Sequence, residues 1–138
     1  MAIFNKFNQF VADKNNGVHN LGSDTLKAMF TNTAPTSADA LKSDITEISA
    51  GGGYTTGGEA ITVTSSTQTG GTYSLVTVDK VFTATGAVNT FQYVVLYNDT
   101  PTSPLKPLIG FFDYGSAITM ANAETFTIDF GATTITDV

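Results

Sequence analysis

The stretch from Phe91 to Gly115 constrains the fold of this 138-residue chain most, because it holds the densest apolar and aromatic material in the sequence. Successive side chains of an extended strand point to opposite faces. One face of residues 91–97 is then apolar and the other nearly so, namely Phe91, Tyr93, Val95 and Tyr97 against Gln92, Val94 and Leu96. A strand that is apolar on both faces is covered on both sides. The stretch therefore predicts a central strand of a β core.

A second apolar run, Leu108–Phe112, follows a connection rich in proline and ends at 113–115. The connection starts with the sequence Asn-Asp-Thr-Pro at 98–101, which predicts a turn because Asx side chains bond nearby backbone and proline presets φ. Proline cannot donate to a strand ladder, so the connection should lie outside the sheet interior. The two apolar runs therefore predict a β-hairpin with a long loop.

Other segments of alternating polarity recur about 8–12 residues apart, with Gly, Asn and Pro between them. They are Thr25–Thr31, Ala60–Ser66, Tyr73–Thr85, Ala117–Met120, Thr125–Phe130 and Thr133–Val138. We interpret Tyr73–Thr85 as one strand with a bulge near 79–80 or as two short strands. Residues 36–48 indicate a short helix or a turn region, and 69–72 a hairpin turn.

This pattern predicts a mainly β fold, an antiparallel jelly-roll-like or Greek-key sandwich or barrel with a short N-terminal helix or arm. We divide the chain into an N-terminal helical arm, residues 1–21, and a single β domain, residues 22–138. In the arm, apolar side chains recur at helical spacing until Asn15-Asn16-Gly17 stops the helix. The arm packs against its own β domain or docks on a neighbouring subunit. In the second case the expected assembly contacts are Phe4, Phe7, Phe10 and Val11.

Composition restricts the classes of partner. The net charge is −6, with twelve carboxylates against six lysines and no arginine, which disfavours nucleic acid and anionic membrane surfaces as partners. The chain has no cysteine, so disulfides and thiolate metal sites are excluded. No apolar run approaches the roughly 20 residues of a membrane span. Polar residues interrupt the N-terminus, so we expect no signal peptide and folding in a cytosol.

Catalytic chemistry has few candidates here. His19 is the single histidine, and a serine or threonine nucleophile would need it as base. Paired carboxylates in principle support glycoside chemistry, and the candidates are Asp99, Asp113, Glu124 and Asp129. Each also suits an ordinary role in a turn or on a solvated strand. We interpret His19 as a structural hydrogen-bonding residue and expect the protein not to be an enzyme.

Two loops have features of ligand sites. The Asn98-Asp99 loop offers oxygen ligands for calcium but lacks the spacing Asp-x-Asp-x-Asp. The glycine-rich loop 51–58 is not followed by Lys-Ser/Thr and lacks a strand–loop–helix context, so it does not predict a phosphate site. We expect no cofactor and no metal.

Several segments resemble small virion structural proteins of tailed bacteriophages, and they keep the same order along most of the chain. They are Met1–Val11, Gly17–Lys27, Thr31–Pro35, Asp44–Ile48, Val95–Thr100, Pro107–Gly110 and Asp113–Gly115. Phage proteins of this size and β content are similar to capsid decoration, or cement, proteins. The resemblance implies a homo-oligomer, a dimer or trimer, that binds the major capsid protein outside the shell. It implies synthesis in the host cytoplasm, a place on the capsid exterior, and no catalytic residues.

Two other functions remain open. The chain is alternatively a tail, fibre or head-fibre component that binds a host surface glycan, with Tyr54, Tyr73 and Tyr114 as residues that stack on sugars. A more distant alternative is a small glycosidase that uses paired carboxylates, among which Asp99 and Asp113 would be tested first.

Overall fold

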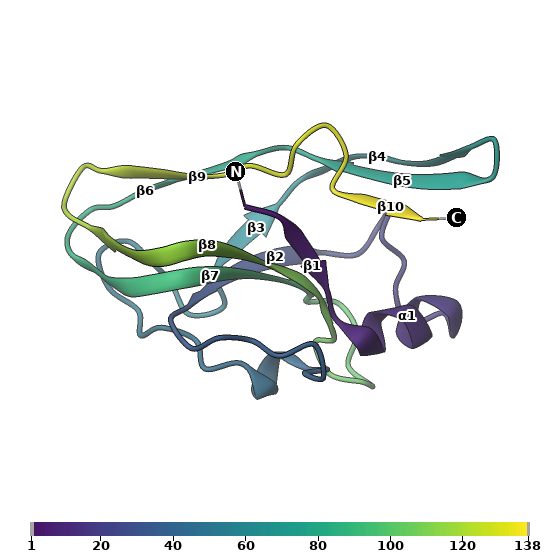
Figure 1. Cartoon of the computed structure of the whole chain (residues 1–138), viewed down its shortest axis with the longest axis horizontal. Helices are drawn as coiled ribbons and strands as arrows, with labels where there is room; N and C mark the ends of the chain where they lie inside the picture. Colours follow the sequence, from purple (N-terminus) through teal and green to yellow (C-terminus); the bar gives the residue numbers. More distant parts are fainter. Residues whose placement is uncertain (1, 138) are drawn as a thin grey trace.

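The computed structural model describes residues 2–137 and is a mainly β, antiparallel fold with a short N-terminal helix (Figure 1). The prediction of this fold class is confirmed. The strands are β1 Phe4–Lys6, β2 Leu26–Thr31, β3 Glu59–Ile61, β4 Val63–Thr69, β5 Thr72–Thr77, β6 Lys80–Thr83, β7 Val88–Asn98, β8 Leu108–Met120, β9 Thr125–Ile128 and β10 Ile135–Asp137. The helical elements are α1 Asn8–Asn15 and a short 3-10 helix, η1 Lys42–Asp44.

The strands form two layers. One layer is a five-stranded sheet in the order β1-β8-β7-β2-β3. The other holds a three-stranded sheet, β10-β5-β4, and a two-stranded sheet, β6-β9, which lie above the first layer in Figure 1. The described pairs are antiparallel. A jelly-roll-like or Greek-key strand order is compatible with this arrangement and stays a prediction.

The main core lies between the layers and is centred on Phe30 of β2. Its ring stacks on those of Tyr54 and Phe91 at centroid distances of 4.9 and 4.3 Å. The rings of Phe82 and Phe126, from β6 and β9, meet it edge-on at 5.4 and 5.8 Å. Aromatic rings prefer such offset and edge-to-face contacts, so this cluster joins the five-stranded sheet to the layer above it.

A second, smaller core covers the opposite face of the five-stranded sheet, with Phe7, Met29, Val95, Tyr97 and Leu108. Residues 94–98 of β7 are therefore buried on both faces, as predicted for the central strand. The predicted assignment of its faces is wrong at one position. Phe91 shares the main core with Val94 and Leu96, because the alternation breaks between 91 and 94, where pairing with β8 is irregular.

The N-terminal segment is part of the β domain and not a separate arm. Residues 4–6 form edge strand β1, which pairs with β8, and the helix begins only at Asn8. Phe7 and Phe10 are 0% and 1% exposed within this chain, so they have no surface left for a partner. The prediction that these two residues are assembly contacts is therefore corrected. Phe4 is half-buried against the ring of Phe112, at 5.3 Å. Val11 is exposed, at 40%.

This placement predicts that Phe7→Ser destabilises the fold by about 3–5 kcal/mol, the usual loss when a buried Phe is truncated, whereas Val11→Ser changes it little. Both residues were predicted contacts, and only Phe7 is buried. The measurement is urea unfolding of the two single variants. Equal stabilities for the two would show that the N-terminal segment does not belong to the core.

The remaining strand predictions hold with three changes. Ala60–Ser66 is two strands in different sheets, β3 and β4, which meet at Thr62. Tyr73–Thr85 is two strands, β5 and β6, as one of its interpretations had it. The runs predicted as Leu108–Phe112 and Ala117–Met120 form one long strand, β8. The hairpin turn at 69–72 and an edge strand near the C-terminus are confirmed, while Val138 lies outside the described residues.

Candidate functional site

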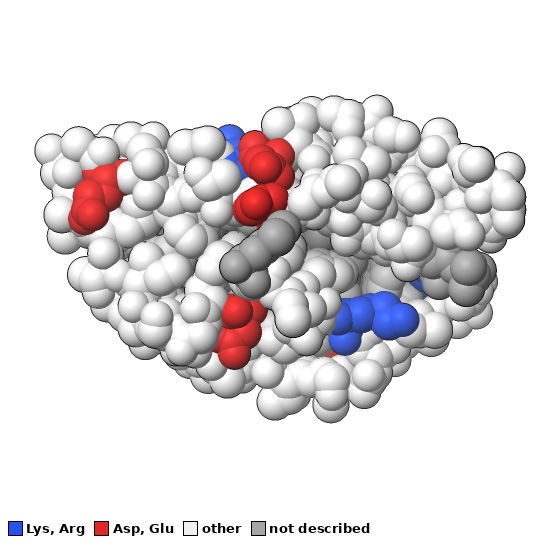
Figure 2. Space-filling model, turned by 45° about the horizontal axis from the view of Figure 1, so that its top comes forward, with Lys and Arg blue, Asp and Glu red and all other residues white. Residues whose placement is uncertain are grey.

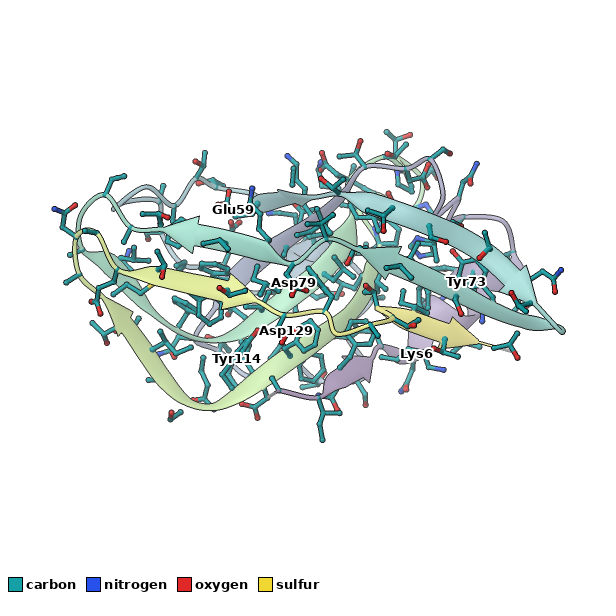
Figure 3. All side chains as sticks on the ribbon, turned by 90° about the horizontal axis from the view of Figure 1, so that it is seen from above. Lys6, Glu59, Tyr73, Asp79, Tyr114 and Asp129 are labelled. Atoms are coloured by element: carbon teal, nitrogen blue, oxygen red, sulfur yellow. The ribbon has the colours of Figure 1, made fainter. Side chains whose placement is uncertain are left out.

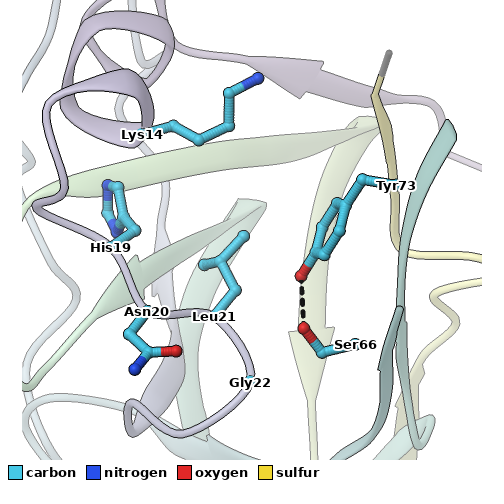
Figure 4. A pocket seen from close by; sticks show the side chains of 7 residues that line it. All are labelled: Lys14, His19, Asn20, Leu21, Gly22, Ser66 and Tyr73. Carbon is cyan, nitrogen blue, oxygen red and sulfur yellow. Dashed lines mark hydrogen bonds between the residues drawn. The ribbon is translucent and has the colours of Figure 1, made fainter. Parts of the chain in front are cut away.

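One hollow lies between the end of α1, the loop that follows it and the β4–β5 hairpin (Figure 4). We call it the hairpin hollow. Its volume is about 280 Å³, which is just below the usual range of small-molecule sites, roughly 300–1,000 Å³. Its lining residues are Lys14, His19, Asn20, Leu21, Gly22, Ser66 and Tyr73.

Tyr73 forms one wall of the hairpin hollow with a half-buried ring. Its hydroxyl is hydrogen-bonded to Ser66 Oγ at 2.8 Å, across the hairpin (Figure 4). The loop approaches this hairpin closely at Gly22, where a Cβ would lie 3.1 Å from Ser66 Oγ. The position of the tyrosine ring is therefore fixed by its own hydrogen bond.

The opposite wall is tied to β7 through Asn98, which is fully buried. Asn98 Oδ1 accepts a hydrogen bond from Thr100 N–H at 3.1 Å, the predicted Asx turn, and this contact fixes which way the amide points. Asn98 Nδ2 then donates to Asp24 Oδ2 at 2.7 Å and to His19 Nδ1 at 3.0 Å. Because Nδ2 only donates, His19 Nδ1 must be the acceptor and is unprotonated.

A neutral His19 ring must therefore carry its proton on Nε2. That atom is buried and has no hydrogen-bond partner among the described residues. Burial lowers the pKa of His19 below its ordinary value, although the carboxylates of Asp13 and Asp24 act in the opposite direction. A protonated ring would also set two donors, Nδ1–H and the Asn98 amide, against each other. The structure thus holds His19 as a neutral residue that joins the loop to β7.

This geometry predicts that the protein loses stability as the pH falls below about 6.5, the ordinary pKa of histidine in an unfolded chain. The unfolded chain binds the proton more readily than the folded one, so stability rises with pH between the folded and unfolded pKa values. The measurement is the urea midpoint at about pH 7.5 and about pH 5.5, a window where free carboxylates stay largely ionised. His19→Asn, which offers an acceptor oxygen that does not titrate, should remove most of the difference.

The four candidate catalytic carboxylates serve local structure. Asp99 forms ion pairs with Lys27, at 3.5 Å, and Lys106. Burial acts to raise the pKa of Asp99, but the two lysines outweigh it and the pKa lies below the ordinary value. The other three accept hydrogen bonds from backbone N–H groups two or three residues away: Asp113 from Gly115, Glu124 from Ala121 and Asp129 from Gly131.

The three tyrosines proposed to stack on sugars differ in exposure. Tyr54 is 3% exposed, and its hydroxyl donates to Glu47 at 2.6 Å and accepts from Phe30 N–H at 3.0 Å. The prediction that Tyr54 stacks on a sugar is therefore corrected, because its ring is enclosed. Tyr114 packs edge-on against Phe126 at 5.0 Å, and burial with the nearby Asp129 carboxylate raises its pKa to about 12. Tyr73 lines the hairpin hollow.

Sequence reasoning missed Glu47, which organises the glycine-rich loop. Its carboxylate accepts hydrogen bonds from the Tyr54 hydroxyl and from Gly57 N–H, the latter at 2.6 Å, and forms an ion pair with Lys42 at 3.1 Å. The side chain of Glu47 is only 11% exposed. No local motif signals this role, since the three donors lie up to 10 residues away along the chain. The glycine-rich loop therefore closes around a carboxylate of its own chain.

The outer surface combines sparse charge with isolated apolar side chains. The face in Figure 2 shows separate acidic groups and few lysines on a mainly uncharged surface. A second hollow, of about 280 Å³, is lined by Leu41, Lys42, Ser43, Leu105 and Lys106. Among the described residues, the large apolar side chains that are exposed are those of Ile3, Val11, Val78, Val81 and Leu105. Among residues 2–137 no group of three or more His, Asp or Glu side chains is placed to hold a metal.

Comparisons with models of protein families, with curated proteins and with solved structures find no match for this chain. Within the described residues, no helix has the length and apolar character needed to cross a membrane.

Proposed function

We propose that the chain is a bacteriophage capsid decoration (cement) protein, which binds the major capsid protein on the outside of the shell and stabilises it. The proposal rests on the expected resemblance, in order along most of the chain, of its segments to tailed-phage virion proteins. Those segments include the centre of the fold, since Val95–Thr100 spans the buried end of β7 and its Asx turn. The proposed form is a homo-oligomer, a dimer or trimer, on the capsid exterior.

The surface supports this role physically. Ile3, next to edge strand β1, is 78% exposed, and Leu105, in the long loop of the central hairpin, is 55% exposed. Burying such side chains at joints between capsid subunits contributes roughly 25 cal/mol per Å² of apolar area, before the cost of association. One copy gains little from this. Many identical copies that bridge neighbouring subunits act multivalently and resist the internal pressure of a filled shell.

The test is the number of copies in purified particles, measured by quantitative mass spectrometry against the major capsid protein. Decoration predicts a ratio near one copy per capsid subunit. It also predicts that Leu105→Asp weakens binding to shells, while Thr67→Asp, at an exposed position on β4 of the three-stranded sheet, serves as the matched surface control. A ratio of a few copies per particle would contradict decoration.

A second candidate is a tail, fibre or head-fibre component that binds a host surface glycan. The observation in its favour is Tyr73, whose fixed ring forms a wall of the hairpin hollow. A low copy number together with glycan binding would favour this function over decoration.

A further inference from the structure

We propose that the hairpin hollow is a binding site for a single neutral sugar unit. The inference goes beyond capsid decoration and does not depend on it, because it concerns a site on the isolated chain. Two segments far apart in the sequence, 14–22 and 66–73, converge on this hollow. Its lining combines the apolar side chain of Leu21, which is 6% exposed, with polar side chains.

The ring of Tyr73 gives the hollow its recognition element. A sugar ring presents a face of C–H groups that packs on an aromatic ring, and its hydroxyls both donate and accept hydrogen bonds. Tyr73 is half-buried and lines the hollow. The hydrogen bond between its hydroxyl and Ser66 Oγ, at 2.8 Å, holds the ring in place before any ligand arrives. Such prior ordering lowers the entropy cost of binding.

The loop on the facing side of the hollow is ordered by hydrogen bonds to groups behind it. Asp24 Oδ2 accepts hydrogen bonds from Asn20 N–H at 2.8 Å and from Asn98 Nδ2 at 2.7 Å, and His19 is joined to Asn98. The side chain of Asn20 is exposed at the hollow, and an amide both donates and accepts. A small number of fixed polar groups beside an aromatic ring is the usual composition of a small-molecule site.

Charge and size select the class of ligand. Lys14 lies at the rim, but the carboxylates of Asp13 and Asp24 act on His19 in the adjoining wall, and the whole chain carries a net charge of −6. These negative charges would repel an anionic ligand, and a neutral ligand avoids that repulsion. The volume of about 280 Å³ suits one sugar ring and not an extended chain. The class is therefore a neutral monosaccharide or the terminal unit of a glycan.

The test titrates the purified full chain with glucose, galactose, mannose and N-acetylglucosamine, followed by amide chemical shifts in NMR spectra. We expect saturable shifts at residues 14–22 and 66–73, with a dissociation constant in the millimolar range for at least one sugar. Tyr73→Ala should weaken this binding at least tenfold. Tyr114→Ala is the matched control, because Figure 3 shows Tyr114 well away from Tyr73 in the molecule, and binding should be unchanged.

Asn20→Ala provides a second variant that leaves the fold intact, since its side chain is exposed in a loop. It should weaken sugar binding at least threefold even if Tyr73→Ala fails to fold. Absence of saturable shifts with all four sugars, or shifts that Tyr73→Ala and Asn20→Ala both leave unaltered, would overturn the proposal. Neither outcome changes the copy number in virions, so this test and that of decoration fail independently.

Discussion

Replacing Gly58 by alanine is expected to destabilise the protein by about 3 kcal/mol or more, because backbone strain and a steric clash act together. Gly58 has φ = +85°, a left-handed conformation that costs a residue with a Cβ roughly 1–2 kcal/mol. A Cβ at this position would also lie 2.0 Å from the carbonyl oxygen of Ala28, which is fully buried in β2. Backbone atoms cannot rotate away, so β2 or the glycine-rich loop would have to shift.

Gly17→Ala is the matched control for this variant. Gly17 has nearly the same φ, +79°, but a Cβ there would meet no atom within 4 Å. The two variants share the conformational cost, and the difference between their free energies of unfolding isolates the clash with β2. We expect Gly17→Ala to lose only about 1–2 kcal/mol in urea unfolding. Equal losses would mean that the glycine-rich loop does not press against β2.

The sequence predicts the position and burial of the central strand, but not the face on which each of its side chains lies. Continuous apolar residues on both faces of 91–97 require burial on both sides, and β7 has it. The face on which Phe91 lies could not be predicted in this way, because side chains alternate strictly only where the pairing of the two strands is regular. In the structure, residues between Asp113 and Ile118 of β8 bulge opposite Phe91 and Tyr93, and Gly115 there has φ = +80°. A partner strand thus decides which face a side chain takes.

The N-terminal segment shows a different limit. The spacing of Phe4, Phe7 and Val11, with Phe10 one position off, indicates one helical face, yet Phe4 and Phe7 lie outside α1. Phe4 sits on a strand because β8 offers it a ladder, and Phe7 lies in the extended residue between the two elements. Helical periodicity measures spacing alone, and tertiary pairing overrides it when an open sheet edge is near. Whether such a segment meets its own core or a partner is decided by topology.

The candidate site was the least predictable part. Tyr54 and Tyr73 both follow glycine-rich turns and look alike in sequence. They differ because Glu47, seven residues before Tyr54, encloses its hydroxyl, whereas Tyr73 bonds to the neighbouring strand at Ser66. The hairpin hollow joins segments about fifty positions apart, and no local pattern records that closeness. Among the residues that line the hairpin hollow, Tyr73 carried the signal that sequence reasoning used, as an aromatic residue able to stack on a sugar.

Replacing Phe30 by alanine is expected to cost about 3–5 kcal/mol, the range for truncation of a buried Phe in a well-packed core. Phe30 is 0% exposed and its ring contacts four other aromatic rings, from both layers of the fold. The cavity cannot collapse easily, because three of those rings belong to strands that hydrogen bonds hold in register and the Tyr54 hydroxyl is held by hydrogen bonds to Glu47 and Phe30 N–H. Urea unfolding gives the loss directly, and it should approach the whole stability of a small domain.

Phe126→Ala is the matched control, because its ring belongs to the same cluster but is only half-buried on β9. It should cost clearly less than Phe30→Ala. The double variant with Phe91→Ala tests the packing itself, since the rings of Phe30 and Phe91 stack at 4.3 Å and removing both should cost less than the sum of the single losses. Strict additivity of the two losses would contradict the stacked core. Non-additivity would show that the rings of Phe30 and Phe91, from neighbouring strands β2 and β7, stabilise the core as a stacked pair.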